Sequence, residues 1–200
     1  MSPLTNTSLN PECGRIIVDC SDEVLFAHVQ QGDHRAFGLL VQRYQDRVYS
    51  IARKALYYSQ DAQDAVQQAF LQAWQKRQAY NAQWRFRPWL YRIVANICID
   101  EYRRQQRRQA APQECLESLP APDAPEQAYA HLECRRALEA ALAHVPMEAR
   151  MVLVLCYVDG LSYSEIARVR GISVQTVKSQ LRRAKTLMRQ RLEAYREVKP

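Results

Sequence analysis

The sequence predicts an all-α protein made of two small helical domains joined by a flexible, proline-rich acidic linker. Three observations predict this fold class. Apolar residues recur at steps of three and four along most of the 200-residue chain, which is the period of an amphipathic helix. Only 5 residues are glycine, few for the many turns of a β-protein. A stretch dense in proline, residues 109–127, separates two helical regions and predicts a linker.

The same pattern divides the chain into segments. Residues 1–21 have no periodicity and are expected to form a flexible leader. Residues 22–108 are expected to form the first domain and residues 128–195 the second, on either side of the linker, with a short tail at 196–200. The longest apolar run, Met151 to Val158, is far shorter than the roughly 20 residues of a bilayer span. We therefore expect no membrane insertion and a cytoplasmic protein.

The sequence contains no motif that indicates a catalytic function. The 6 cysteines form no Cys-x-x-Cys pair, and the chain is long enough to build a core without disulfides. His131 and Cys134 lie three residues apart, but two ligands alone make a weak metal site. A P-loop, a nucleophile elbow and a His-Glu-x-x-His motif are all missing from the sequence. We therefore expect no catalytic residue, metal, cofactor or small-molecule substrate.

Four helices are expected in the first domain. Ser21 or Asp22 caps the first helix, which ends at Gly32, and Asp33 caps the second. The third begins near Asp61, and Pro88 suits the first turn of the fourth. The expected buried residues include Val24, Leu25 and Val29, then Phe37, Leu40, Tyr44, Val48 and Ile51, then Ala62, Ala65, Ala69 and Phe70, and finally Leu90, Ile93, Val94 and Ile97.

The strongest local pattern lies near the C-terminus. Ser162 and Glu165 have the spacing of a capping box, Gly171 supplies a tight turn, and Ser173 can cap a second helix. A short helix, a glycine turn and a helix with a cationic outer face predict a helix-turn-helix that enters the DNA major groove. Its inner face is expected to hold Val174, Val177, Leu181, Ala184 and Met188. Its DNA-facing residues are expected to be Gln175, Thr176, Lys178, Ser179, Arg182 and Arg183.

Positive charge is concentrated in two blocks of a chain whose net charge is +7. Residues 85–108 hold seven arginines against two acidic residues, and residues 161–200 hold ten basic residues against three acidic ones. The segment 109–150 between them is acidic. This distribution predicts two contacts with one polyanion, although two solvated helix faces would look the same.

The first basic block has an aromatic segment beside it. Tyr80 to Arg85 lies between two expected helices, where aromatic and amide side chains on a basic loop could hold unstacked bases. Phe86 and Trp89, by contrast, are expected in the core. The residues expected to contact separated strands are Tyr80, Asn81, Gln83, Trp84 and Arg85, followed by Arg92, Asn96, Arg103, Arg104 and Arg107 on the next helix. One domain for duplex and one for separated strands suggests opening of DNA.

Five motifs carry a resemblance to a known family. They are Gly32–Phe37, Asp61–Phe70, Phe86–Ile93, Leu161–Ala167 and Thr176–Ser179. In this order, with the acidic linker between, they resemble the extracytoplasmic-function (group IV) sigma factors of bacterial RNA polymerase over most of the chain. Gln68 stands where an acidic residue is common, and Gln175 and Gln180 also depart from the usual pattern.

The resemblance implies a function and partners. The first domain would be sigma domain 2, contacting the minus-ten promoter element and the β′ clamp helices of core RNA polymerase. The second would be sigma domain 4, contacting the minus-thirty-five element and the β flap. The protein would start transcription of a stress or an envelope or metal-response regulon. A membrane-associated anti-sigma factor would control it. The polymerase-binding residues implied by the match are Asp61, Asp64, Gln67, Gln68, Phe70 and Gln72.

The sequence alone leaves one alternative function open. A conventional helix-turn-helix repressor or activator would account for residues 160–191, but it would not account for the aromatic basic loop.

Overall fold

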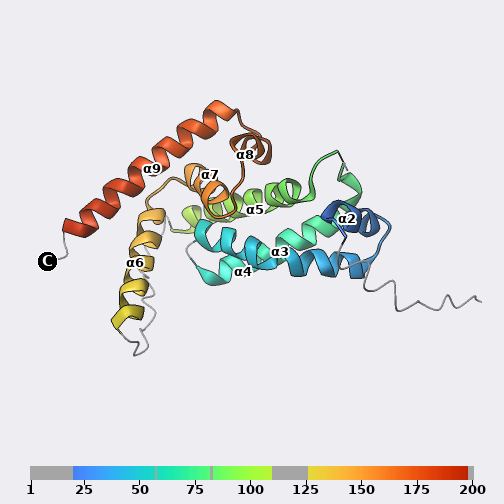
Figure 1. Ribbon diagram of the computed structural model, residues 1–200, viewed down its shortest axis with the longest axis horizontal. Coiled ribbons are helices and arrows are strands. Elements are labelled where there is room, and N and C mark those ends of the chain that lie inside the picture. The colour runs from blue at the N-terminus through green and yellow to red at the C-terminus, as the bar shows by residue number, and fades with distance from the viewer. Residues whose placement is uncertain (1–19, 57, 82, 110–125, 198–200) are drawn as a thin grey trace, which may run out of the picture.

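The computed structural model describes residues 20–56, 58–81, 83–109 and 126–197, and every regular element in them is helical (Figure 1). In chain order these elements are α2 (Asp22–Gln30), α3 (His34–Ala55), α4 (Ser59–Gln75), the 3-10 helix η1 (Arg77–Ala79), α5 (Phe86–Gln109), α6 (Glu126–Ala143), α7 (Met147–Tyr157), α8 (Tyr163–Arg170) and α9 (Val174–Glu197). The predicted all-α class is confirmed. No helix in these segments combines the length and hydropathy of a membrane span.

Some of the predicted segments lie outside the described residues. These are nearly all of the leader and the linker, and the end of the tail. The bounds that can be compared differ slightly from the prediction. Helix α5 continues to Gln109, and α6 begins at Glu126, two residues before the expected start of the second domain.

The predicted capping residues form the expected hydrogen bonds. Ser21 Oγ accepts from Val24 N at the start of α2, and Asp33 Oδ1 accepts from the backbone N–H groups of Arg35 and Ala36 at 2.8 and 3.1 Å. Side-chain acceptors of this kind satisfy the N–H groups that a helix N-terminus leaves unpaired. The starts of α2 and α3 are therefore fixed by local chemistry that the sequence displays.

The core of the first domain (α2–α5) follows the predicted stripe, with one correction. Leu25, Phe26 and Val29 of α2 are buried against α3 and α5, whereas Val24 is 47% exposed and was wrongly placed in the core. Helix α4 faces α3 and α5 with small side chains, which let the helices approach closely. These are Ala62, Ala65, Ala69 and Ala73.

The second domain (α6–α9) is organised around α7. Met151, Val152 and Leu155 of α7 are buried, and α8 and α9 pack against this helix. Helix α6 packs against α9 through a smaller apolar cluster that includes Leu142 and Met188. In Figure 1, α7 and α8 lie between α9 above and α5 below.

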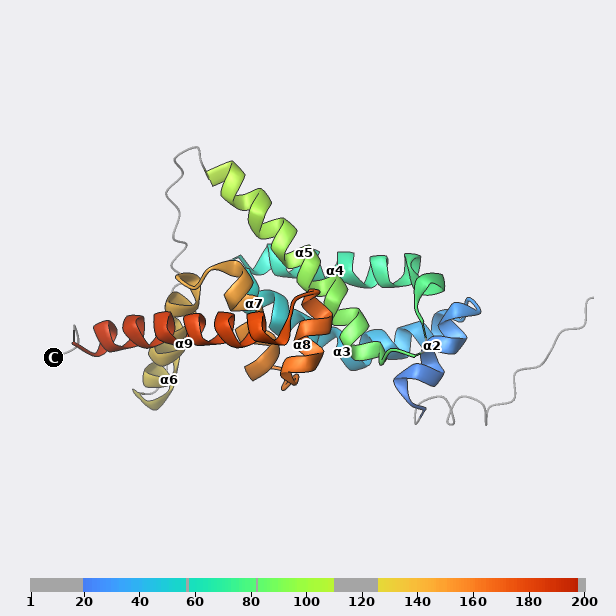
Figure 2. The same ribbon diagram turned by 90° about the horizontal axis from the view of Figure 1, so that it is seen from above.

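The two domains share one continuous apolar core, which the sequence did not predict. Helices α7 and α8 pack on α5, and α7 also contacts α3 (Figure 2). Buried residues of both domains, such as Leu90 and Ile166, belong to the same cluster. The prediction of two domains joined by a linker did not include this direct contact between them.

Arg150 of α7 lies buried at the domain junction, with 1% of its surface exposed. Its guanidinium donates to the carbonyl of Ala55, the last residue of α3, at 2.8 Å. It also donates to the carbonyl of Ala143, the last residue of α6, at 2.9 Å and to that of Val145, just after α6, at 3.0 Å. The ring of Tyr102 on α5 lies 5.4 Å from the guanidinium carbon. One cation thus contacts the ends of two helices, where backbone carbonyls are otherwise unpaired.

Candidate nucleic-acid interface

The helix-turn-helix of α8 and α9 has the predicted local chemistry. The hydroxyl of Ser162 accepts from Glu165 N, and the Glu165 carboxylate accepts from Ser162 N at 2.9 Å, which completes the capping box. Gly171 adopts φ 66°, a left-handed conformation that suits glycine, and ends α8. Ser173 Oγ accepts from Thr176 N at 3.0 Å and caps α9.

The outer face of α9 is exposed, as a recognition helix requires. Gln175, Lys178, Ser179, Arg182 and Arg183 all have exposed side chains. Val177, Leu181, Ala184 and Met188 are buried on the opposite side as predicted, but Val174 is 40% exposed and was wrongly assigned to the inner face.

Two of the predicted DNA-facing hydroxyls have partners within the helix. The Thr176 hydroxyl lies 2.8 Å from the Ser173 hydroxyl and belongs to the cap of α9. The Ser179 hydroxyl donates to the carbonyl of Thr176 at 2.9 Å. The amide of Gln175 and the cationic groups of Lys178, Arg182 and Arg183 therefore have the longest reach toward DNA from this face.

The loop before α5 divides into a buried and an exposed part. Tyr80 is 5% exposed, and its ring packs 4.7 Å from the ring of Phe26 and 5.2 Å from that of Trp89. Its prediction as a base-stacking residue is wrong, because its ring is part of the core. Burial and the neighbouring Glu23 carboxylate raise the pKa of Tyr80 to about 12. Phe86 is buried and Trp89 packs against the core, as expected.

The remaining residues of this loop are available to a ligand. Trp84 is 45% exposed, and Asn81, Gln83 and Arg85 are exposed beside it. The carbonyl of Trp84 accepts a hydrogen bond from the buried Tyr80 hydroxyl, and Asn81 Oδ1 accepts from Gln83 N at 2.9 Å. The backbone of the loop is therefore held in place while the indole remains outside the core.

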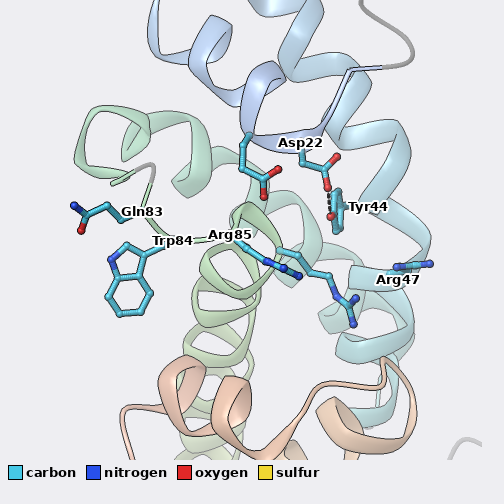
Figure 3. A pocket seen from close by; sticks show the side chains of 8 residues that line it. Asp22, Tyr44, Arg47, Gln83, Trp84 and Arg85 are labelled. Carbon is cyan, nitrogen blue, oxygen red and sulfur yellow. Dashed lines mark hydrogen bonds between the residues drawn. The ribbon is translucent and has the colours of Figure 1, made fainter.

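An open cavity of about 480 Å³ lies beside this loop. Figure 3 shows Trp84 and Gln83 at one end and Arg47 at the other, with Asp22 and Tyr44 hydrogen-bonded between them. The residues that line it are Asp22, Glu23, Tyr44, Arg47, Gln83, Trp84, Arg85 and Arg87. Burial and the bond to Asp22 raise the pKa of Tyr44, so its hydroxyl remains a proton donor. The cavity therefore combines cationic, aromatic and carboxylate groups.

The arginines of α5 differ in whether a carboxylate lies against their guanidinium. Arg92, Asn96 and Arg107 are exposed, as predicted. Arg103 is exposed as well, but its guanidinium lies 3.1 Å from Glu148 of the second domain and 3.7 Å from Asp100. Arg104 pairs with Glu101 at 3.1 Å. A phosphate would therefore have to replace an existing carboxylate at Arg103 and Arg104.

The residues of α4 implied to bind polymerase differ in exposure. Asp64, Gln67 and Gln68 are exposed, and Gln72 is half-buried. Phe70 is buried in the core, so its prediction as a contact residue is wrong. Asp61 is half-buried and accepts a hydrogen bond from Gln105 Nε2 of α5; burial, with Glu101 nearby, raises the pKa of Asp61.

Two family models match the chain in the same order as the two domains. The sigma-70 region 2 model matches residues 40–108, and the sigma-70 region 4 model matches residues 135–188. The first range ends with α5 and contains the aromatic loop, and the second contains the helix-turn-helix. The fold and the candidate interface thus define a sigma-70-type transcription initiation factor.

Two relatives specify the family further, one of them matched over most of its length and the other over about three fifths of it. The chain is 36% identical over 174 residues to the ECF RNA polymerase sigma-E factor of Escherichia coli, covering 82% of this chain and 91% of that protein. It is 37% identical over 152 residues to the ECF RNA polymerase sigma factor SigE of Mycolicibacterium smegmatis, covering 75% of this chain and 59% of that protein. The chain belongs to the ECF sigma factor family.

A solved structure agrees with this assignment. CnrH, determined in complex with the cytosolic domain of CnrY, superposes with a TM-score of 0.67 at 30% identity. The superposition covers 86% of this chain and 97% of that one.

Sequence reasoning missed the residues that join the domains. Arg87 and Asp159 form an ion pair between the first turn of α5 and the loop after α7, and Arg150 lies in the core. Arg150 directly precedes the apolar run Met151–Val158, and a charge at the edge of such a run is a signal that could have indicated a buried, paired cation.

Proposed function

We propose that this ECF sigma factor directs core RNA polymerase to promoters and stabilises the opened DNA, while the polymerase performs the chemistry. The observation that carries the proposal is the pair of different nucleic-acid surfaces on one chain. Helix α9 offers an exposed polar and cationic face suited to duplex, and the loop before α5 offers an exposed indole suited to an unstacked base. A role as an enzyme is not part of this proposal.

The second domain would bind the minus-thirty-five element as duplex. The first turns of α9 would enter the major groove, where each base pair presents a distinct pattern of donors and acceptors. The Gln175 amide can pair with adenine, and Lys178, Arg182 and Arg183 can reach guanine edges or phosphates. Thr176 and Ser179 would support the helix rather than read bases, because their hydroxyls are bonded within it.

The first domain would capture a base of the minus-ten element once it leaves the stack. Base extrusion costs a few kcal/mol, and stacking on an aromatic ring returns about 1–3 kcal/mol. Trp84 supplies the ring, and the adjoining cavity supplies polar groups on several sides. Arg92, Asn96 and Arg107 of α5 would follow the phosphate backbone of the same strand.

The partners proposed for this chain are core polymerase and an anti-sigma factor. Asp64, Gln67 and Gln68 on the exposed face of α4 would contact the β′ clamp helices, and the second domain would contact the β flap. CnrH was determined in complex with the cytosolic domain of another protein, CnrY. That complex supports a protein partner for the present chain also, and we propose that this partner is an anti-sigma factor. We place the protein in the cytoplasm with the polymerase, held near the inner membrane when its anti-sigma factor is membrane-associated.

The test is transcription reconstituted from purified parts. Core polymerase, this chain and fragments of bacterial genomic DNA are combined, and discrete transcript starts are mapped. We expect starts that require the chain and that share an upstream and a downstream element. Asp64→Ala should weaken binding to core polymerase without changing duplex binding, and Asp46→Ala, which removes an exposed carboxylate from α3, serves as its control.

The alternative function has a distinct outcome in the same assay. A conventional helix-turn-helix regulator would bind duplex with its full affinity in the absence of polymerase and would direct no initiation. That result would overturn the proposal.

A further inference from the structure

A carboxylate of the second domain lies between two arginines where the domains meet. Glu148 is in the first turn of α7, and its Oε1 lies 3.1 Å from Nη2 of Arg103 on α5. Its Oε2 accepts a hydrogen bond from Nη2 of Arg170, the last residue of α8. The contact with Arg103 joins the two domains, whereas the contact with Arg170 lies within the second domain. Only the contact with Arg103 therefore depends on the packing of the domains against each other.

Arg103 is part of a polar stripe along α5. The stripe consists of Arg92, Asn96, Arg103 and Arg107, which follow one another at steps of four, seven and four residues and therefore share one face of the helix. It is about 22 Å long, since a helix rises 1.5 Å per residue. Among the described residues, no carboxylate oxygen lies within 4.0 Å of Arg92 or Arg107. The second domain thus neutralises a point inside the stripe and leaves both of its ends to a ligand.

A carboxylate on an arginine can stand where a phosphate would bind. The planar guanidinium presents its N–H donors in a fork that fits both groups. A similar contact occurs near the start of α5, where Asp159 of the second domain binds Arg87. Arg87 also lines the cavity beside Trp84. Two arginines of the surface proposed for the opened strand thus bind carboxylates of the second domain.

We propose that the second domain masks the strand-binding surface of the first, with Glu148 in the place of a strand phosphate on Arg103, and that an opened strand releases the second domain by displacing Glu148. The strand would first contact Arg92 and Arg107, which are exposed on either side of Arg103 along the stripe. Its phosphate would then replace the carboxylate at Arg103. Glu148 would keep Arg170, whose side chain is only 8% exposed, so the exchange leaves no charge without a partner.

The exchange couples strand binding to separation of the domains. A phosphate at Arg103 and the carboxylate of Glu148 repel each other, so each weakens the binding of the other. By linkage, docking of the second domain weakens strand binding by the same factor by which the strand weakens docking. If the strand binds only separated chains, its apparent Kd is the intrinsic Kd divided by the separated fraction.

This inference rests on the proposed capture of an opened strand by the first domain. It adds that the strand alone, without the upstream duplex and without polymerase, separates the two domains.

Energy transfer between the domains tests the inference in the full chain. A donor and an acceptor dye are attached through non-native side chains at Gln63 of α4 and Gln190 of α9, which are exposed and lie in different domains. The probe is a single-stranded oligonucleotide with the non-template sequence of a minus-ten element mapped by the transcription assay. We expect the oligonucleotide to lower the transfer efficiency, with the same midpoint as its binding measured by fluorescence anisotropy.

Glu148→Gln should make the separation easier. The substitution keeps an amide oxygen for Arg170 but removes the charge that faces Arg103. We expect the oligonucleotide to bind about threefold more tightly, which is the size of effect of a partly exposed ion pair. Glu193→Gln makes the same change at an exposed site of α9 and is the matched control. It should bind the oligonucleotide like the wild type.

Arg103→Gln distinguishes masking from general repulsion between Glu148 and DNA. Without Arg103 there is no guanidinium for Glu148 to mask, so adding Glu148→Gln to this variant should not change its affinity further. An equal gain with and without Arg103 would show that Glu148 acts by repelling the DNA at a distance, and it would overturn the inference.

The outcomes separate this inference from the proposed function. If no transcript start can be mapped, or if the wild-type chain does not bind the oligonucleotide, the proposed function fails. If the wild-type chain binds the oligonucleotide with unchanged transfer efficiency, the domains remain packed around a bound strand. The inference would then be wrong, while the proposed function would stand.

Discussion

The guanidinium of Arg87 in the first turn of α5 binds the carboxylate of Asp159 in the loop after α7, with Nη2 at 2.7 Å and Nε at 2.9 Å from Oδ2. The Asp159 side chain is only 4% exposed, so the pair joins the two domains from a largely buried position. Arg87 also lines the cavity beside Trp84. The contact therefore connects the proposed minus-ten surface with the position of the second domain.

This contact cannot persist when both promoter elements are bound. The minus-ten and minus-thirty-five elements are about 25 base pairs apart, which is about 85 Å of B-form duplex. In the structure, α7 and α8 pack directly on α5. Binding of both elements therefore requires the two domains to separate.

Asp159→Asn is expected to favour the separated form. The substitution removes the charge that holds Arg87. Because the Arg87 side chain is 35% exposed, solvent screens the pair, and we expect it to contribute about 1 kcal/mol. We expect a larger radius of gyration in small-angle X-ray scattering and promoter binding about 3- to 10-fold tighter, because less free energy is spent on opening.

Asp46→Asn is the control for this prediction. Asp46 is exposed on α3, and with Asp159 it lines a small hollow beside Arg87, so the substitution removes the same charge from nearly the same place. The radius of gyration and the promoter affinity of Asp46→Asn should match those of the wild type. Equal behaviour of the two variants would show that the Arg87–Asp159 pair does not govern opening.

Arg150→Met is expected to lower the free energy of unfolding by about 2–4 kcal/mol. The substitution keeps much of the side-chain volume but leaves the carbonyls of Ala55, Ala143 and Val145 without this donor in a buried place. Urea unfolding measures the difference. Arg191→Met, at an exposed site on α9, should change stability by no more than about 0.5 kcal/mol. An equally small effect at Arg150 would mean that water replaces the guanidinium without cost.

The sequence predicted the individual helices well because their causes are local. The cap at Asp33, the capping box at Ser162 and the turn at Gly171 each depend on residues within a few positions of one another. Periodic burial predicted most of the core for the same reason. Val24 and Val174, which were wrongly predicted to be buried, lie in the first turns of their helices. There the periodic pattern has neighbouring helical residues on the C-terminal side only.

The contacts between distant parts of the chain were not predictable in the same way. Periodicity indicates that a side chain faces inward but does not name its neighbour, so Tyr80 was assigned to a ligand when its ring packs on Phe26 and Trp89. The Arg87–Asp159 pair joins residues 72 positions apart. The proline-rich segment predicts a linker by its composition, but composition does not indicate whether the domains that it joins also touch.

Loss of the capping box should make the helix-turn-helix less stable in a pH-dependent way. Hydrogen bonds from Ser162 lower the pKa of Glu165 below its ordinary 4.5. The folded state therefore binds this proton less readily than the unfolded state, and the stabilisation is complete above pH 4.5 and is lost as pH falls through the lowered pKa. Ser162→Ala should cost about 1 kcal/mol at neutral pH.

The pH dependence is tested by comparing urea unfolding of the wild type and Glu165→Gln from about pH 3 to pH 7. The variant should be less stable than the wild type at neutral pH, and the difference should shrink toward acid. Glu193→Gln, on an exposed site of α9, should follow the wild type at every pH. A constant difference across the range would contradict a charged role for Glu165.

Substitutions at Trp84 should affect DNA binding, whereas loss of the Tyr80 ring should affect folding. Trp84→Ala removes a half-exposed ring, so it should leave urea unfolding nearly unchanged while weakening binding to a single-stranded minus-ten oligonucleotide by about 1–3 kcal/mol, or about 5- to 150-fold. Tyr80→Ala removes a buried ring and should lower the free energy of unfolding by about 3–5 kcal/mol. Tyr80→Phe keeps the ring but loses the hydrogen bond to the Trp84 carbonyl, so it should lose less affinity for the oligonucleotide than Trp84→Ala. Trp84→Phe should recover part of the affinity that Trp84→Ala loses. Fluorescence anisotropy measures the binding. If Tyr80→Phe lost affinity while Trp84→Ala kept it, the base would be recognised by the tyrosine hydroxyl and not by the exposed indole.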